Sequence, residues 1–315
     1  MRYFVTGGCG FIGSHLVDRL MQMGSVTVYD NLSNGKEELI AHHLGKKGFR
    51  FVKADLLDVK RLTKELKGHD FVFHIAANSD VRIGETRPGL DLEQGPIVTA
   101  NLLEAMRQNG ITKIAFSSSS VVYGETEVFP TPEDFGPELP ISLYGAAKLG
   151  AEGLISAYCG TYGFQSWIFR FANIIGPRGT HGVLVDFMGK LRKDPKHLEI
   201  LGDGKQRKSY LTVEECVDSM LYIVKNSDQK VNVFNLGTKD QITVARIAEL
   251  LVSELGLKDV KFQYTGGPVG WAGDVRAMLL DTAKLNKLGW VSKLNSEKAV
   301  LHAIKHLKKE IWDRQ

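Results

Sequence analysis

The sequence predicts an α/β protein with a doubly wound parallel sheet, followed by a smaller α/β lobe. Short apolar runs alternate with helical stretches through residues 1–172, which is typical of parallel crossover units with helices on both faces. A glycine-rich loop joins the first apolar run to the first helix. Polar residues follow the ends of successive apolar runs, and this is the edge of such sheets where function gathers.

The first strand leads into a phosphate-binding loop. Residues 3–13 read YFVTGGCGFIG, in which Gly7, Gly10 and Gly13 are spaced three apart and a helix is expected over Phe11–Met23. Positions without side chains let a pyrophosphate reach the backbone, where free N–H groups and the helix dipole favour negative charge. This is the dinucleotide signature of a Rossmann fold, so we expect a dinucleotide ligand.

The second strand, Val26–Tyr29, ends in Asp30, seventeen residues after the last glycine. A carboxylate at this place accepts hydrogen bonds from free ribose hydroxyls and repels a 2′-phosphate, so we expect NAD rather than NADP. The alternative is a turn residue at the strand end, because the residues that follow also favour a turn: Asn31, Ser33, Asn34 and Gly35.

The alternation continues to the end of the first domain. Strands are expected at Phe49–Lys53, Phe71–Ile75, Lys113–Ser117 and Ser166–Arg170, and helices at Val59–Leu66, Leu92–Asn109 and Gly145–Tyr162. After Asn173 the rhythm changes, so we assign residues 173–315 mainly to a substrate-binding lobe with some segments returning to the first domain. Its expected helices are Val183–Arg192, Val213–Lys225, Val244–Leu255 and Ser296–Glu310, and its expected strands are Glu199–Leu201 and Val233–Leu236.

Composition excludes several classes of protein. With 315 residues, 43% hydrophobic and 24% charged, the chain can bury one large core or two moderate ones, and its net charge of +4 gives no reason to expect nucleic acid. Three scattered cysteines, no apolar run long enough for a bilayer and no room for a signal peptide predict a cytoplasmic protein. His42 and His43 are neighbours, but a helix would turn their side chains apart, so we expect no metal site.

Tyr144 and Lys148 are the candidate catalytic pair. They stand four residues apart in YGAAK at the start of an expected helix, so both project from one face. A free phenol has a pKa of about 10, too high for a base at neutral pH. A lysine ammonium and a nicotinamide cation would favour the phenolate and lower that pKa. The alternative is an ordinary amphipathic helix that contains a tyrosine and a lysine.

The strand before this helix stops at four serines, Ser117 to Ser120, in FSSSSVVYG. Such hydroxyls can satisfy backbone groups, or one that faces Tyr144 could share a hydrogen bond with a substrate hydroxyl. The residues alone do not say which serine this is. No histidine lies near the run in a nucleophile pattern, so we do not expect covalent serine chemistry.

Together these motifs resemble a known family over nearly the whole chain. The chain is similar to the extended short-chain dehydrogenases/reductases, specifically the nucleotide-sugar epimerases of the UDP-galactose/UDP-glucose 4-epimerase type. The resemblance lies in TGGCGFIG, Asp30-Asn31, Asp55-Leu56, residues 74–77, FSSSSVVYG, YGAAK, FRFANIIGPR, GDGKQ, GDVRAMLLD and KLNKLGW.

The resemblance implies roles for individual residues. Tyr144 becomes the base, Lys148 its electrostatic partner and ribose contact, and Ser119, four residues before Tyr123, the hydroxyl that bridges substrate and base. Asn173 would contact the substrate's phosphates, and Met278 would lie near the wall beside the sugar's 2-substituent. Further NAD contacts implied by the family are Phe11, Ile12, Asn31, Ser33, Asn34, Gly35, Asp55, Leu56, Ile75, Ala76 and Ala77, whereas His74 would be structural.

The chain also departs from the family pattern. Lys208 stands where an arginine is usual and is followed by Ser209 and Tyr210, and a second phosphate-binding arginine is replaced near Val269. Lys208, Arg207 or Arg276 could compensate, although lysine lacks the bidentate fork of arginine. Gly95-Pro96 replaces the usual Asn-Val, which would leave a contact near the nicotinamide to Gln94.

The activity implied is NAD-dependent epimerisation of a nucleoside-diphosphate hexose at C4. The Tyr144 phenolate would take the C4 hydroxyl proton while hydride passes to NAD, and the transient 4-keto sugar would rotate before hydride returns, with NAD bound throughout. A 4,6-dehydratase is one alternative, but that reaction uses an Asp-Glu pair where Ser120 and Val121 stand. A nonenzymatic NAD sensor is another, although such proteins commonly lose the Tyr/Lys pair. The family also implies a homodimer built on the helices expected at Leu92–Asn109 and Gly145–Tyr162.

Overall fold

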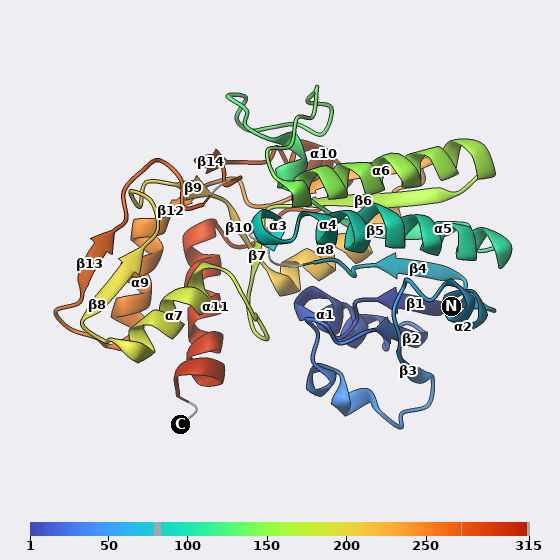
Figure 1. Cartoon of the computed structure of the whole chain (residues 1–315), viewed down its shortest axis with the longest axis horizontal. Coiled ribbons are helices and arrows are strands. Elements are labelled where there is room, and N and C mark those ends of the chain that lie inside the picture. The colour runs from blue at the N-terminus through green and yellow to red at the C-terminus, as the bar shows by residue number, and fades with distance from the viewer. Residues whose placement is uncertain (79–82, 272, 314–315) are drawn as a thin grey trace. The chain divides into compact units, whose positions relative to one another are not determined.

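A seven-stranded sheet forms the centre of the fold. The computed structural model describes residues 1–78, 83–271 and 273–313 (Figure 1). The strand order is β11-β6-β5-β4-β1-β2-β3, and β1 pairs in parallel with both β2 and β4. The pairs β2–β3 and β4–β5 are parallel as well. The chain therefore winds outward in both directions from β1, which confirms the predicted doubly wound fold.

The elements around this sheet follow the predicted alternation of strands and helices. The strands are β1 Arg2–Thr6, β2 Ser25–Asp30, β3 Phe49–Lys53, β4 Phe71–His74, β5 Lys113–Ser119, β6 Gln165–Phe171 and β11 Val231–Leu236. The helices are α1 Phe11–Leu20, α2 Val59–Leu66, α3 Ile83–Thr86, α4 Pro88–Leu92, α5 Val98–Gln108, α6 Leu143–Tyr162 and α8 Val213–Asn226. Turns of 3₁₀ helix occur at Glu37–Leu39, Ala41–His43 and Ser120–Tyr123.

The two faces of the sheet carry separate sets of side chains, because strand residues alternate in direction. Phe4, Val72 and Ile114 are register partners across β1, β4 and β5, so they share one face. They belong to one buried cluster with Leu102 of α5 and Ile155 of α6. This cluster also includes residues of α2, so α2, α5 and α6 cover that face.

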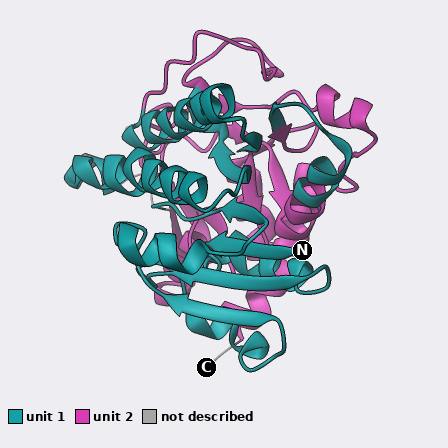
Figure 2. Cartoon of the chain, turned by 90° about the vertical axis from the view of Figure 1, so that its right-hand side faces the viewer, with its two compact units in different colours: residues 1–122, 142–170, 220–234 teal, residues 123–141, 171–219, 235–315 magenta. Residues whose placement is uncertain are grey.

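The chain divides into two compact units, which Figure 2 colours separately. The first consists of Met1–Val122, Ser142–Arg170 and Met220–Phe234, and the second of Tyr123–Ile141, Phe171–Ser219 and Asn235–Gln315. Each unit is therefore assembled from three stretches of sequence. The segment Met220–Phe234, which carries most of β11, returns to the first unit after the chain has entered the second.

The second unit has three small sheets and its own core. Its sheets are β10-β7, β12-β9-β14 and β13-β8, and its core includes Leu198, Ile247 and Ile304. The strands are β7 Asn173–Ile175, β8 His197–Ile200, β9 Arg207–Lys208, β10 Tyr210–Thr212, β12 Ile242–Thr243, β13 Lys261–Tyr264 and β14 Ala277–Met278. The helices are α7 Val183–Lys193, α9 Val244–Leu255, α10 Ala283–Leu288 and α11 Ser296–Leu307, with a π-helical turn at Lys308–Trp312.

Two expected helices have different bounds in the structure. The helix expected over Leu92–Asn109 begins earlier, as α4, and reaches α5 through a π-helical turn at Glu93–Ile97 that contains Pro96. Proline has no N–H and its ring obstructs a regular helical turn, so a wider turn accommodates it. The first helix ends at Leu20 instead of Met23, because the N–H groups of Gln22 and Met23 donate to carbonyl oxygens three residues back, in turns that follow the helix.

Two further expectations concern the membrane and the thiols. Within the described ranges, no helix is both long enough and apolar enough to cross a bilayer. Cys9, Cys159 and Cys216 are all buried and free.

Truncating the core of the first unit should destabilise the protein. Leu102 is fully buried between α5 and the sheet, so Leu102→Ala should lower the free energy of unfolding by about 2–5 kcal/mol. Urea denaturation followed by circular dichroism measures this change. The control Met23→Ala removes a side chain that is 54% exposed and should change stability by less than about 0.5 kcal/mol. Equal losses in both variants would contradict the assignment of this core.

Candidate functional site

The glycine loop turns from β1 into α1 with no space for side chains. Gly7 has φ +70°, and a Cβ there would lie 2.6 Å from the Ala76 amide nitrogen. A Cβ at Gly13 would lie 2.1 Å from the Gly7 carbonyl oxygen. Gly10 caps α1 with an extended backbone and no side-chain cap. No side chain therefore caps the first N–H groups of α1. These groups are available to an anion, which the helix dipole also attracts, and this is the arrangement that binds phosphate.

Asp30 is buried at the end of β2 and holds the glycine loop in place. Its Oδ2 accepts a hydrogen bond from the Cys9 N–H at 2.9 Å, and its Oδ1 accepts one from the Leu32 N–H at 2.8 Å. Burial raises the pKa of Asp30, and these two N–H donors oppose that shift. Each carboxylate oxygen has a second lone pair. Asp30 can therefore hold the turn after β2 and still accept a hydrogen bond from a ribose hydroxyl.

The segment after Asp30 packs on the same loop. A Cβ at Gly35 would lie 2.9 Å from the Cys9 carbonyl carbon, and the Lys36 N–H donates to the Cys9 carbonyl oxygen at 2.9 Å. Asn31 Nδ2 donates to Asp55 Oδ2 at 2.8 Å, and the Ser33 N–H donates to Asn31 Oδ1 at 2.9 Å. Gly35 is thus fixed by close backbone contact, and Asn31 joins the ends of β2 and β3.

The other expected cofactor contacts gather at this edge of the sheet in the first unit. Because β3, β2, β1 and β4 are adjacent and parallel, the residues after them lie at the same edge. Phe11 and Ile12 open α1, whereas Gln94 lies in the π-helical turn before α5 and donates to Glu93 Oε1 at 3.3 Å. The residues at the strand ends are Asn34, Asp55, Leu56, Ile75, Ala76 and Ala77.

His74 links three elements beneath this edge. Its Nδ1 lies 2.7 Å from Thr6 Oγ1 and its Nε2 lies 3.0 Å from Thr99 Oγ1. Burial, and then the charge of Lys148, lower the pKa of His74 to about 3, so the ring is neutral. These contacts join β1, β4 and α5 and agree with a structural role.

Lys148 is buried beneath Tyr144 on α6. Ser142 caps α6 by accepting a hydrogen bond from the Gly145 N–H at 3.1 Å, so Tyr144 lies in the first turn. Lys148 Nζ donates to the Ser117 carbonyl oxygen at 2.5 Å and lies 5.7 Å from the centre of the Tyr144 ring. Burial lowers the pKa of Lys148 to about 7, although Glu152 opposes the shift. The ammonium is therefore close to losing its proton at neutral pH.

In the chain by itself, the pKa of Tyr144 lies above that of a free phenol, and the expectation that Lys148 and nicotinamide together lower it stays a prediction for the site with its cofactor. Burial raises the pKa of Tyr144, and the negative charge of Asp91 on α4 raises it further. Asp91 is 2% exposed, and its Oδ1 accepts a hydrogen bond from Asn78 Nδ2 at 2.9 Å. Both effects act against the phenolate in the chain alone, so a positive charge added near the ring would favour deprotonation.

Sequence analysis missed a buried ion pair that holds α6 to the sheet. Arg170 on β6 donates to Glu152 through Nη2 at 2.7 Å and through Nε at 3.1 Å, and Ser118 also donates to Glu152. Both charged side chains are at most 7% exposed. Two signals were present: Glu152 continues the spacing of four from Tyr144 and Lys148, and Arg170 interrupts the apolar strand WIFRF, where a charge needs a partner.

The four serines at the end of β5 have different partners. Ser117 Oγ donates to the His74 carbonyl oxygen at 3.4 Å, and Ser118 donates to Glu152. Ser119 Oγ accepts a hydrogen bond from the Val121 N–H at 3.4 Å, and Ser120 begins a 3₁₀ turn. Among the described contacts, Ser117 and Ser118 use their hydroxyl protons within the fold, and Ser119 is an acceptor.

Four of the expected substrate contacts, Asn173, Lys208, Arg276 and Met278, lie in the second unit, whereas Ser119 and Tyr144 lie in the first. Ser209 links three of these four. The Asn173 N–H and Nδ2 both donate to the Ser209 carbonyl oxygen at 3.3 Å, and the Ser209 N–H donates to the Met278 carbonyl oxygen at 3.2 Å. Lys208 and Met278 are register partners in β9 and β14. The sequence motifs NIIG, GDGKQ and GDVRAM are therefore neighbours in this unit.

Two of the three cations expected to compensate for the family's arginines, Lys208 and Arg276, are already in ion pairs. Lys208 Nζ is bound to Asp274 and lies 5.1 Å from the centre of the Trp271 ring. Arg276 lies 3.2 Å from Asp203 and is half-exposed. Either cation would act on a diphosphate with part of its charge already offset by a carboxylate.

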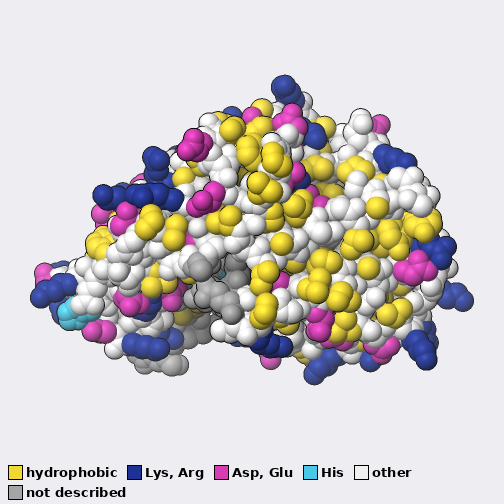
Figure 3. All heavy atoms as spheres, turned by 45° about the horizontal axis from the view of Figure 1, so that its top comes forward, with side chains coloured by type: hydrophobic (Ala, Val, Ile, Leu, Met, Phe, Trp, Pro, Cys, Tyr) yellow, Lys and Arg dark blue, Asp and Glu magenta, His cyan; other side chains and the backbone are white. Residues whose placement is uncertain are grey.

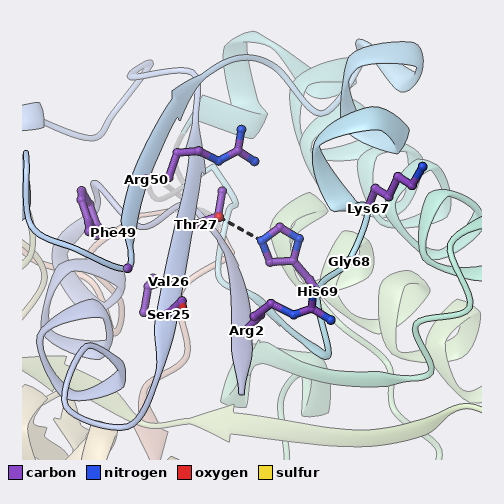
Figure 4. A pocket seen from close by; sticks show the side chains of 10 residues that line it. Arg2, Ser25, Val26, Thr27, Phe49, Arg50, Lys67, Gly68 and His69 are labelled. Atoms are coloured by element: carbon purple, nitrogen blue, oxygen red, sulfur yellow. Dashed lines mark hydrogen bonds between the residues drawn. The ribbon is translucent and has the colours of Figure 1, made fainter.

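A surface pocket of about 330 Å³ lies at the opposite ends of the strands in the first unit (Figure 4). Arg2, Arg50 and Lys67 give it a basic lining, and His69 Nε2 lies 2.9 Å from Thr27 Oγ1 beside it. Arg2 pairs with Asp70 and Arg50 pairs with Glu65. Its lining includes none of the expected cofactor or catalytic residues, so we do not assign the site to this pocket.

Comparisons with known proteins agree on one family. The model of the NAD dependent epimerase/dehydratase family matches residues 3–237. The chain is 31% identical to a putative UDP-glucose 4-epimerase of Methanocaldococcus jannaschii, over 96% of this chain and 97% of that protein. It is similar to a crystal structure of a UDP-galactose 4-epimerase, with 40% identity, a TM-score of 0.89 and coverage of 99% and 100%. It is also similar to a UDP-glucose 4-epimerase from Thermotoga maritima with UDP-glucose, with 33% identity, a TM-score of 0.88 and the same coverage.

A methyl group in the glycine loop should abolish dinucleotide binding. Gly13→Ala would place Cβ against the Gly7 carbonyl oxygen, so we expect no NAD to be retained by the purified protein. Nucleotide released by denaturation and quantified by chromatography measures this. Gly189→Ala on α7 is the matched control, because a Cβ there meets nothing within 4 Å. Normal NAD content in Gly13→Ala would contradict the assignment of the phosphate cradle.

Proposed function

The chain belongs to the NAD dependent epimerase/dehydratase family, and from that premise we propose that it interconverts UDP-glucose and UDP-galactose by NAD-dependent epimerisation at C4. One observation carries this proposal. A glycine cradle without space for a side chain lies in the same unit as Tyr144, Lys148 and Ser119, the combination that the reaction requires. The enzyme is an isomerase that needs the cofactor for each turnover but consumes none.

The residues present fit NAD. The cradle accepts a pyrophosphate where Cβ atoms are excluded, and the first turn of α1 has no side-chain cap in competition with it. We propose that Gly7, Gly10 and Gly13 hold the pyrophosphate and Asp30 the adenosine ribose. Lys148 would contact the second ribose. When bound, NAD supplies a reversible two-electron oxidation at a sugar carbon.

We propose that Tyr144 is the base that removes the proton of the C4 hydroxyl and later returns it. Burial raises the pKa of the phenol in the chain alone, so a positive charge added nearby, such as that of oxidised nicotinamide, would favour the phenolate. Ser119 would bridge the sugar hydroxyl and Tyr144, because its neighbours Ser117 and Ser118 donate their protons within the fold.

Substrate recognition is assigned to the second unit. We propose that Asn173 and Lys208 contact the diphosphate, with Asp274 holding the lysine side chain in position. Arg276 would add a weaker contact from its exposed position. Met278 is 7% exposed and would limit the space beside C2 of the sugar. The residues of this unit would determine which nucleotide base and which C2 substituent the enzyme accepts.

The 4,6-dehydratase alternative is weaker because elimination of water across C5 and C6 needs an acid and a base next to the bridging hydroxyl. Ser120 and Val121 occupy that place in a 3₁₀ turn, and neither side chain titrates near neutral pH. A nonenzymatic sensor is also disfavoured. The ion pair of Arg170 and Glu152 maintains α6 and its Tyr/Lys pair in a defined place, which a sensor would not require.

We propose further that the enzyme is a cytoplasmic homodimer. Leu92, Ile97, Leu143 and Tyr162 are each more than 40% exposed, on or beside the helices α4, α5 and α6. Figure 3 shows hydrophobic side chains gathered on the face that carries these helices. Exposed apolar surface of this kind favours association with a second copy. The three free, buried thiols support a reducing compartment.

Removing the phenol should abolish epimerisation. We expect Tyr144→Phe to lower kcat for UDP-galactose by about 10²–10⁴-fold while NAD stays bound, because only the proton-transfer group is lost. Conversion of UDP-galactose to UDP-glucose, followed by chromatography, measures this. A parallel panel of UDP-, GDP- and dTDP-hexoses and UDP-N-acetylhexosamines identifies the preferred substrate. An unchanged rate in Tyr144→Phe would refute the assigned base.

Removing the lysine should change the pH dependence of the reaction. Lys148→Met deletes a positive charge 5.7 Å from the Tyr144 ring, so the phenolate is less favoured and the pKa of Tyr144 rises. The acidic limb of the kcat/KM profile should move upward by about 1–3 pH units. Lys193→Met on α7 is an exposed control and should leave the profile in place. The same profile in Lys148→Met and wild type would show that Lys148 does not tune the base.

A further inference from the structure

His42, His43 and Asp18 form a cluster that the sequence did not predict. The two histidines lie in a 3₁₀ turn, Ala41–His43, and the centroids of their rings are 4.0 Å apart with the ring planes inclined by 44°. The expectation that neighbouring histidines point apart is therefore wrong here. Nε2 of each ring lies 2.7 Å from the same atom, Asp18 Oδ1 on α1. Two imidazole nitrogens and one carboxylate oxygen thus converge on one point.

We propose that this cluster binds a divalent transition-metal ion such as Zn²⁺ through His42 Nε2, His43 Nε2 and Asp18. Two imidazoles and a carboxylate are a donor set that suits zinc and its neighbours in the first transition series. The three ligand atoms lie within 4.8 Å of one another. A fourth position would be left to water. The site is separate from the residues assigned to NAD and to catalysis.

The geometry permits coordination after a small movement. Zinc bonds to nitrogen and oxygen of about 2.0–2.2 Å separate tetrahedral ligand atoms by about 3.3 Å, so the 2.7 Å contacts must open by about half an ångström. His42 and Asp18 can make this movement because their side chains are 46% and 26% exposed. His43 is 8% exposed and would act as the fixed ligand.

The surroundings indicate an exchangeable site. A metal on Nε2 moves the ring proton to Nδ1, which usually donates to a second acceptor. His43 Nδ1 is buried and has no such acceptor among the described residues. Missing outer partners reduce metal affinity by about 10–100-fold in known sites. We therefore expect binding that responds to the concentration of free metal, unlike a permanent structural zinc.

The location connects the cluster to the cofactor site. Asp18 belongs to α1, whose first turn forms the phosphate cradle, and the histidines follow the segment in which Gly35 and Lys36 pack on Cys9. A metal would join this segment to α1 by bonds stronger than the present hydrogen bonds. An ion that binds only the folded state stabilises it in proportion to its concentration. Zinc should therefore raise the melting temperature of the protein.

The simpler interpretation is that Asp18 only accepts hydrogen bonds from the two rings. Asp18→Asn separates the two interpretations, because asparagine keeps Oδ1 as a hydrogen-bond acceptor but is a much weaker zinc ligand than a carboxylate. His42→Ala removes the most exposed ligand and leaves the buried ring in place. Both variants should fold. A melting temperature equal to that of the wild type, measured for each variant in the presence of EDTA, verifies this.

The experiment is calorimetric titration of the EDTA-treated, NAD-loaded protein with ZnCl₂. We expect one equivalent bound at micromolar zinc, an upward shift in melting temperature, and at least a tenfold loss of affinity in Asp18→Asn and His42→Ala. The double variant His302→Ala/His306→Ala removes another pair of neighbouring rings, 4.7 Å apart on α11, and should bind zinc as the wild type does. No saturable binding, retained binding in His42→Ala, or loss confined to the α11 variant would each overturn the proposal.

Discussion

The buried ion pair between Glu152 and Arg170 is the interaction on which the candidate active site depends. It attaches α6 to the sheet at β6, and Ser118 attaches the same carboxylate to β5. Removing one partner of such a pair leaves an uncompensated charge in the interior, which costs about 3–5 kcal/mol. Lys148 and Tyr144 lie one and two turns before Glu152 on the same face of α6, so the ion pair determines where the candidate catalytic side chains stand.

Burial dominates the electrostatics around Tyr144. It raises the pKa of the phenol, as does the negative charge of Asp91, and it lowers the pKa of Lys148. The same surroundings that disfavour the phenolate in the chain alone make an added positive charge more effective, because charges interact strongly in a poorly solvated site.

The second unit shows how the departures from the family pattern are accommodated. Lys208 replaces a planar, bidentate arginine, and the fold surrounds it with Asp274 and Trp271. This fixes a flexible side chain, which reduces the entropy lost when a ligand is bound. Ser209, which follows Lys208, joins β7 and β14 through its backbone groups. Positions that differ from the family's usual residues are therefore part of an ordered set of contacts.

The sequence by itself determined the fold class, the glycine cradle, Asp30 and the candidate pair on α6. These features depend on local periodicity and short spacings, which the order of residues specifies directly. Only the tertiary structure decided the partners of Glu152 and Arg170, the effect of Asp91 on Tyr144, and the meeting of His42 and His43 with Asp18. These contacts join residues 18 to 53 positions apart in the chain, and neither local spacing nor composition specifies which distant side chains are buried together.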